Sequence, residues 1–288
     1  MTDITSIAEL EKNAELAETG WARFGMHILI FMFIVGGWEL LGVFKQLNDL
    51  LLPPPSEIGG DFFDMWFVTG RVWWHFFVTM IEATAGFFIG VTIGTSLAVA
   101  AAVSPLFRRY LAPYAVAFNV TPGIAVAPLI IAWFGFGWSS KIALATLVCF
   151  FSPFINTLTG LLYTDEEATE LFRSMRANRT QYFWKLQLPS ATPLIVAGLK
   201  LALTGALLGA IVAEFFSASE GIGILMQRFA FKLDIGSALA TLLSMSLMGL
   251  MFFTITEVLD FKLVFWRRDS RMQAISKKRK AAWNTGDE

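Results

Sequence analysis

The sequence predicts an all-α, polytopic membrane protein with six transmembrane helices. Three observations predict it: apolar residues make up 56% of the 288 residues, charged residues make up 16%, and mean hydropathy is +0.61. A globular domain normally carries about a quarter charged residues, because it must cover itself with solvent-facing groups. The same composition excludes low-complexity disorder, and the single cysteine, Cys149, excludes a disulfide scaffold.

Six stretches are long and apolar enough to cross a bilayer, which takes roughly 20 residues per helix. They lie at 24–44, 84–103, 111–136, 142–163, 193–216 and 236–259. The first is too long for the apolar region of a signal peptide and follows an acidic leader, so we interpret it as a retained helix. The predicted organisation is an N-terminal segment (1–23), a transmembrane domain (24–260) and a basic tail (261–288).

The distribution of lysine and arginine predicts which way the spans run. With a cytoplasmic N-terminus, sixteen basic residues fall in inner segments and five in outer segments, with Lys200 inside the fifth span. Basic residues concentrate on the cytoplasmic side, so both termini are predicted to be cytoplasmic. The tail also fits a nucleic-acid patch by charge alone. We favour a topology anchor beside anionic lipid and expect no nucleic-acid partner.

A short helix is predicted on the outer side between the first two spans. Prolines at 53–55 form a rigid extended piece, and Ser56 is a candidate N-cap for a helix ending near Phe67. Trp66, Trp73 and Trp74 fit an interfacial aromatic belt on this side of the membrane.

Small residues and prolines predict how the second and third spans pack. Gly86, Gly90 and Gly94 form a ridge of small residues that lets helix backbones approach closely, and packing within the chain is favoured over an oligomer interface. The third span carries three prolines, which leave backbone carbonyls that need protein or water partners in lipid. This helix therefore faces either a water-filled path or the bundle interior, and the candidate path-lining residues are Asn119, Thr121 and Pro122.

Charged residues inside predicted spans are costly and usually functional. Lys200 and Glu214 are candidates for contact with a polar solute, and an ion pair or interface placement is the alternative for both. Glu39 has the same two interpretations, whereas Glu257 is interpreted only as an ion pair or interface residue. Lys200 weakly favours an anionic solute.

The inner loop at 164–192 is predicted to form two short amphipathic helices. The segments 164–167 and 178–181 both read as capping boxes, and Leu188-Pro189 is predicted to stop the second helix. Such helices either lie on the bilayer surface or offer a docking surface to a soluble partner.

This loop resembles the EAA loop of ABC importer permeases. The resemblance rests on Glu170-Leu171-Phe172, Arg176 and Leu186-Gln187-Leu188-Pro189, which match the family spacing throughout. Two departures stand out: the alanine pair is Leu171-Phe172, and the usual glycine is Arg176. Loss of that glycine predicts either that the tight turn is lost or that it moves to Asn178, which tolerates left-handed geometry.

Segments along nearly the whole chain are similar to permeases of the nitrate/sulfonate/taurine type. They lie at 52–55, 122–129, 133–137, 151–157, 212–216 and 221–223. The resemblance implies a MetI-like type I importer fold in the bacterial inner membrane, a second permease copy in a homodimer, two ATP-binding cassette subunits and an external, periplasmic substrate-binding protein.

By the same resemblance, the chain is a non-catalytic permease for a small polar or anionic solute. It has no phosphate-binding loop of the G-x-x-x-x-G-K-[ST] type, so we expect no cofactor or metal in this chain and expect ATP and Mg²⁺ on the partner ATPase. The resemblance implies that the ATPase-docking residues are Glu170, Leu171, Phe172, Arg176, Tyr182, Phe183, Leu186, Leu188 and Pro189, with the aromatic side chains filling a groove on the ATPase.

Two other functions fit a membrane protein. A membrane-embedded enzyme needs clustered catalytic side chains inside the spans, whereas this sequence has scattered charges. A secondary transporter that uses no ATP predicts carboxylates near the midplane. Glu39 and Glu214 instead lie towards the outer side, and Glu257 lies towards the inner side.

Overall fold

A computed structural model describes residues 20–44, 52–217 and 219–264, and within these ranges the regular structure is entirely helical. The predictions for the acidic leader and for the basic residues at 267–280 of the tail fall outside the described residues.

Among the described residues, five helical segments are long and apolar enough to span a membrane, and a bent pair of helices makes six when it is counted as one span. The spanning helices are α2 (Gly20–Val43), α4 (Arg71–Val103), α5 (Pro105–Val120) with α6 (Gly123–Phe134), α7 (Trp138–Cys149) with α8 (Phe151–Leu162), α11 (Leu188–Ser217) and α13 (Ile235–Leu263). The all-α membrane fold is therefore confirmed, and the predicted count of six spans holds when the bent pair α5–α6 is taken as one span.

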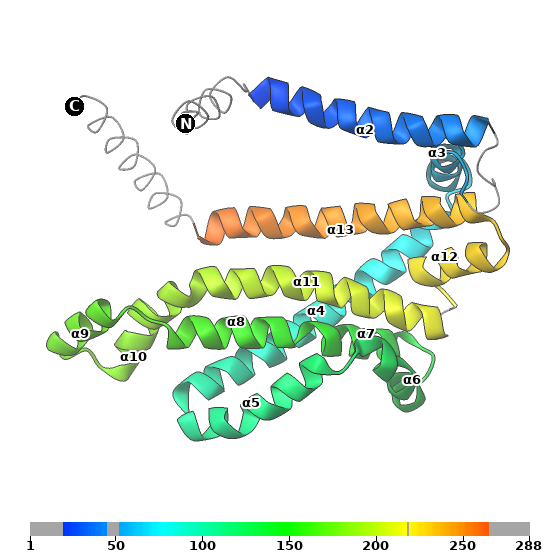
Figure 1. Ribbon diagram of the computed structural model, residues 1–288. Coiled ribbons are helices and arrows are strands. Elements are labelled where there is room, and N and C mark those ends of the chain that lie inside the picture. The colour runs from blue at the N-terminus through cyan, green and yellow to red at the C-terminus, as the bar shows by residue number, and fades with distance from the viewer. Residues whose placement is uncertain (1–19, 45–51, 218, 265–288) are drawn as a thin grey trace, which may run out of the picture.

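Shorter helices lie at the two ends of this bundle. One end carries α9 (Glu166–Ser174) and α10 (Arg179–Tyr182), and the start of α2 and the end of α13 lie at the same end (Figure 1). The opposite end carries α3 (Pro55–Phe63) and α12 (Ile222–Phe231). Two π-helical turns, η1 (Asp64–Val68) and η2 (Phe183–Gln187), follow α3 and α10.

Three predicted boundaries are wrong. The third span is two helices bent by 99°, because Pro122 lacks an N–H group and holds Thr121 in an extended conformation. The second span begins at Arg71, well before residue 84. Pro189 does not stop a helix. The wider π-helical turn η2 accommodates the hydrogen bond that proline cannot donate, and the chain continues into α11.

Glycines on two helices clamp the broken helix α7–α8 from both sides. A β-carbon added at Gly86, Gly90 or Gly94 of α4 would collide with α7 or α8, so the predicted packing within the chain is confirmed. Helix α11 supplies three more glycines on the other side. Ala145 contacts Gly86 and Gly209, Cys149 contacts Gly90 and Gly205, and Pro153 contacts Gly94 and Gly198.

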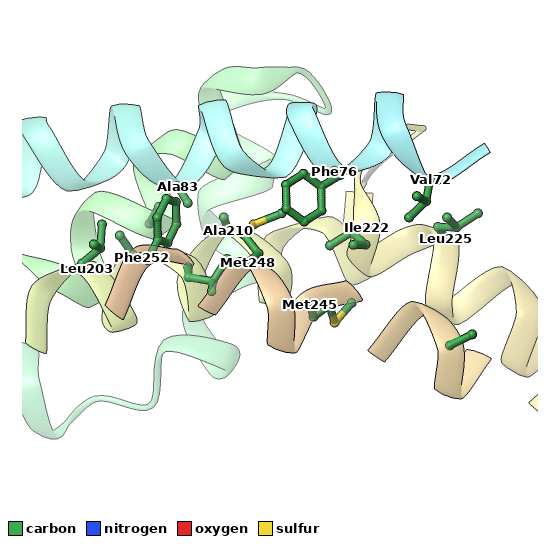
Figure 2. Packing of buried hydrophobic residues seen from close by; sticks show 14 of the residues in the cluster. Val72, Phe76, Ala83, Leu203, Ala210, Ile222, Leu225, Met245, Met248 and Phe252 are labelled. Carbon is green, nitrogen blue, oxygen red and sulfur yellow. The ribbon is translucent and has the colours of Figure 1, made fainter. Parts of the chain in front are cut away.

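The largest apolar core lies among α4, α11, α12 and α13. Phe76 of α4 points toward Ile222 of α12 and Met248 of α13 (Figure 2). Trp66 extends this core and donates a hydrogen bond from Nε1 to Ser244 Oγ of α13 at 2.9 Å. These contacts hold the short helix α12 against three spans.

Helix α2 reaches this core through Trp38 and contacts α3 near its C-terminal end. Glu39 accepts hydrogen bonds from the Ser56 main-chain N–H at 2.9 Å and from the Ser56 hydroxyl at 2.7 Å. The N-cap of α3 is Pro54, so the prediction that Ser56 caps this helix is wrong. The acceptor at this helix start is a carboxylate from another helix, and Ser56 is a donor to it.

Candidate coupling loop and translocation path

The first of the two predicted coupling helices, α9, begins one residue later than predicted. Asp165 is its N-cap and accepts from the Glu167 N–H at 2.9 Å, whereas the Thr164 hydroxyl is buried without a hydrogen-bond partner. The second capping box is confirmed in both halves. Asn178 Oδ1 accepts from the Gln181 N–H at 2.8 Å, and Gln181 Oε1 accepts from the Asn178 N–H at 3.0 Å.

The turn between α9 and α10 stays at Arg176. Its φ is +51°, in the left-handed region, whereas Asn178 has φ −76°. The Ala177 N–H donates to Phe172 O and the Arg176 N–H donates to Arg173 O, which is a Schellman motif with Arg176 at the position that glycine usually takes. The prediction that the turn is lost or moves to Asn178 is therefore wrong, because the paired hydrogen bonds hold Arg176 in this conformation.

Aromatic side chains join the two coupling helices to each other. The rings of Phe172 and Tyr182 are 6.5 Å apart and nearly perpendicular, and the Tyr182 hydroxyl lies 3.2 Å from Thr169 Oγ1. Phe172, Tyr182 and Phe183 are half-buried, and their contact with a groove on the ATPase stays a prediction.

The exposed face of α9 carries Leu171 and Met175, whose exposed fractions are 58% and 71%. Glu170 and Arg176 are exposed beside them, so an apolar pair has charged neighbours on both sides. Met175 was missed as a site residue. The sequence signal for it is its place four residues after Leu171, which puts both side chains on one face of a helix.

The end of the loop is tied to the membrane domain. Gln187 donates from Nε2 to Leu161 O of α8 at 2.6 Å. Leu186 and Leu188 are half-buried on either side of this bond, and Pro189 is exposed. These residues therefore link the coupling helices to α8 and α11.

The break between α5 and α6 exposes all three candidate path residues, Asn119, Thr121 and Pro122. The Thr121 hydroxyl donates to Ala117 O at 2.9 Å, which satisfies one carbonyl at the end of α5. A helix end leaves its last carbonyls without partners inside the helix. This break is therefore a polar main-chain surface within the membrane domain.

The other two candidates have partners in this structure. Lys200 Nζ is 2.7 Å from both Glu257 Oε1 and Asp260 Oδ2, so the ion-pair interpretation of Glu257 is confirmed. Glu214 has no exposed surface, and it accepts hydrogen bonds from the Thr79 hydroxyl and the Gly223 N–H, each at 2.5 Å. Glu214 therefore does not line a path in this conformation, because it binds the main chain of α12.

The arrangement of spans and short helices is similar to that of a solved ABC transporter chain, which defines the fold. A solved structure of the methionine ABC transporter MetNI in inward-facing form matches with a TM-score of 0.56. The match covers 69% of this chain and 97% of that chain at 18% identity, which shows the fold.

The family follows from sequence. Residues 90–265 match the family described as "binding-protein-dependent transport system inner membrane component", and the chain belongs to that family. It is 30% identical over 241 residues to the formylaminopyrimidine transport permease protein ThiX of Halalkalibacterium halodurans, covering 83% of this chain and 95% of that protein. It is 29% identical over 264 residues to the putative aliphatic sulfonates transport permease protein SsuC of Bacillus subtilis, covering 91% and 95%.

The chain is therefore a multi-pass inner-membrane permease subunit of a binding-protein-dependent ABC import system. Members of this family are non-catalytic, and the system includes an ATPase and a substrate-binding protein. This membership overturns the alternative of a secondary transporter that uses no ATP.

Proposed function

We propose that two copies of this chain form the translocation path for a small organic solute that is polar or anionic. The observation that carries the proposal is the exposed break between α5 and α6, where Asn119, Thr121 and Pro122 interrupt an otherwise apolar span. Hydrocarbon does not tolerate unpaired main-chain groups, so this surface needs protein or water against it. A second copy facing the break across a water-filled path meets that need.

The same proposal assigns the ATPase-docking role to the coupling helices α9 and α10. Leu171 and Met175 supply exposed apolar area, while Glu170 and Arg176 supply polar contacts at its edge. Phe172, Tyr182 and Phe183 hold the two helices in shape, and Leu186, Leu188 and Pro189 transmit motion to α8 and α11. ATP and Mg²⁺ bind to the partner subunit.

The direction of the spans follows from this assignment. The coupling helices lie at the same end of the bundle as the start of α2 and the end of α13 (Figure 1). With the ATPase in the cytoplasm, both chain termini are cytoplasmic, in agreement with the excess of basic residues in the inner segments. The binding protein then approaches the end that carries α3 and α12.

The solute class is proposed from the relatives. The names of two of them refer to sulfonic acids: aliphatic sulfonates for SsuC and taurine for the permease TauC of Escherichia coli, to which the chain is 27% identical over 194 residues (66% of this chain, 70% of that one). We propose an aliphatic sulfonate as the solute and taurine as the first probe. Uptake into cells that express the whole operon, measured with labelled taurine and competed by other sulfonates, tests this step.

The docking role is tested by co-purification from mild detergent. We expect tagged wild-type permease to recover an ATP-binding cassette subunit, and Glu170→Arg to lose most of it. Glu166→Arg is the matched control, since Glu166 is an exposed acid in the first turn of the same helix. Equal recovery from both variants would contradict the assignment of Glu170.

The path is tested by cysteine labelling in a Cys149→Ser background. Thr121→Cys is expected to react with a water-soluble thiol reagent faster than Phe33→Cys on the apolar helix α2, because the break faces water. Equal, slow reaction at both positions would contradict a path at the break. Two permease copies per complex, counted by native mass spectrometry, test the homodimer.

A further inference from the structure

The turn that leads into α12 is held by side chains from two other spans. Gly221, Ile222 and Gly223 are all buried, and their three successive main-chain N–H groups stand at the start of the helix. The first N–H groups of a helix have no partner inside it, so burial of this end requires acceptors from elsewhere.

Each of the three N–H groups has its own side-chain acceptor. Gly221 N–H donates to His75 Nδ1 at 3.0 Å, Ile222 N–H to Thr79 Oγ1 at 2.8 Å, and Gly223 N–H to Glu214 Oε2 at 2.5 Å. The Thr79 hydroxyl donates in turn to Glu214 Oε1 at 2.5 Å. We call these side chains, two from α4 and one from α11, the latch.

The glycines make the close approach of the carboxylate possible. Gly221 has φ +116°, a conformation that side chains rarely adopt. A β-carbon at Gly221 would overlap the Glu214 carboxylate, and one at Gly223 would lie 2.8 Å from Glu214 Oε2. The sequence of the turn is therefore matched to a carboxylate at position 214.

Charge and burial favour a latch that stays closed. The start of α12 carries a partial positive charge, which favours a carboxylate there. Thr79 and Glu214 have no exposed surface. Lys141 of α7, also buried, interacts electrostatically with Glu214 and with Glu82 of α4, so a fourth helix contributes charge to the same cluster. Opening the latch would leave three buried N–H groups without acceptors and would remove the Thr79 and Gly223 donors from Glu214.

We propose that the latch makes α4, α11 and α12 one rigid body throughout the transport cycle, with Glu214 as the positioning residue for the outer end of the permease. Helix α12 also packs against α13 through the core of Figure 2. The rearrangement that opens the outer side then takes place elsewhere, and the surface offered to the binding protein keeps its shape. This inference rests on the transport role of the family and on no particular solute.

Hydrogen exchange read by mass spectrometry tests the latch directly. In the purified complex of permease and ATPase, the amides of 221–223 are expected to exchange equally slowly without nucleotide and when trapped with ATP and vanadate. Exchange at least about tenfold faster in the trapped state, the factor for losing one buried hydrogen bond, would overturn the rigid-body proposal.

Variants of Thr79 test the same contacts in the permease alone, without the ATPase. Thr79→Val keeps the shape but removes both hydrogen bonds, so the three amides are expected to exchange about tenfold faster. Thr79→Ser keeps the hydroxyl and is expected to match wild type. The matched control is Thr92→Val, because Thr92 is an exposed residue of the same helix whose hydroxyl bonds only to Phe88 O. Unchanged exchange in Thr79→Val would overturn the latch.

A positioning role also predicts how transport fails. Glu214→Gln keeps an acceptor for Gly223 and is expected to retain most uptake, whereas Glu214→Ala is expected to reduce it about tenfold or more. Basal ATP hydrolysis by the Glu214→Ala complex is expected to stay within about twofold of wild type, while its stimulation by the binding protein is lost. Parallel loss of basal hydrolysis, stimulation and uptake would indicate a folding role only and would overturn the assignment.

Discussion

Replacing Arg176 by glycine is expected to stabilise the turn of the coupling loop. Arg176 has φ +51° at the C-terminal end of α9. An L-residue in that region costs roughly 1–2 kcal/mol, whereas glycine adopts it freely. Glycine in turn loses about 0.5–1 kcal/mol more backbone entropy on ordering. The net expectation is a gain of about 1 kcal/mol for the closed turn, which is about a fivefold change in its opening equilibrium.

The assay is hydrogen exchange at the Ala177 amide, which donates to Phe172 O at 3.0 Å and reports on the Schellman motif. In Arg176→Gly this amide is expected to exchange about fivefold more slowly than in wild type. Ala177→Gly is the control, because the neighbouring residue does not have a positive φ, and a glycine there is expected to speed exchange of the other loop amides. Faster exchange in Arg176→Gly would refute the reasoning.

Three further perturbations act on the membrane domain and its outer surface. Gly90→Ala places a methyl group against α7 and is expected to destabilise the permease by about 1–3 kcal/mol, measured as a lower Tm in detergent. The control is Gly25→Ala, which has open space around it and is expected to leave Tm unchanged or higher. Burial, and next the nearby Asp234, raise the pKa of Asp61. Asp61 therefore contributes stability while it is protonated in acid, and this contribution is lost as pH rises through its folded pKa. Asp61→Asn should raise Tm at pH 7, with a gain that shrinks toward pH 4. A constant gain across that range would contradict the charge argument. Lys200→Met leaves two carboxylates of α13 without their cation and should lower Tm, whereas Lys200→Arg should keep the wild-type Tm. Unchanged uptake affinity in Lys200→Met would exclude contact between Lys200 and the solute.

Much of the architecture was predictable because its signals are local. A span is recognised from roughly 20 apolar residues in a row, since each of them must face lipid or protein. The capping box at Asn178 and Gln181 closes within one helical turn, so neighbouring residues suffice to predict it. The glycine ridge of α4 likewise predicted close packing within the chain, although not that α11 would clamp the same helix from the other side.

The wrong predictions concern residues whose conformation is set by contacts that the neighbouring sequence does not show. Loss of glycine suggested that the turn would leave Arg176, yet two hydrogen bonds hold the arginine in left-handed geometry. Ser56 has the chemistry of an N-cap, yet Glu39 from another helix takes that role. Pro122 predicted a disturbed helix, and the structure has two helices bent by 99° there.

The sequence by itself determined the membrane-embedded helical class, the number of spans, the coupling-loop pattern and the family, because hydropathy, capping and motif spacing are properties of short segments. Only the tertiary structure decided what the charged residues do. Glu214 is separated from Thr79 by 135 residues, and Gly221 from His75 by 146. No local pattern encodes such a pair, since the donor and the acceptor meet only after α4, α11 and α12 have packed together and excluded water.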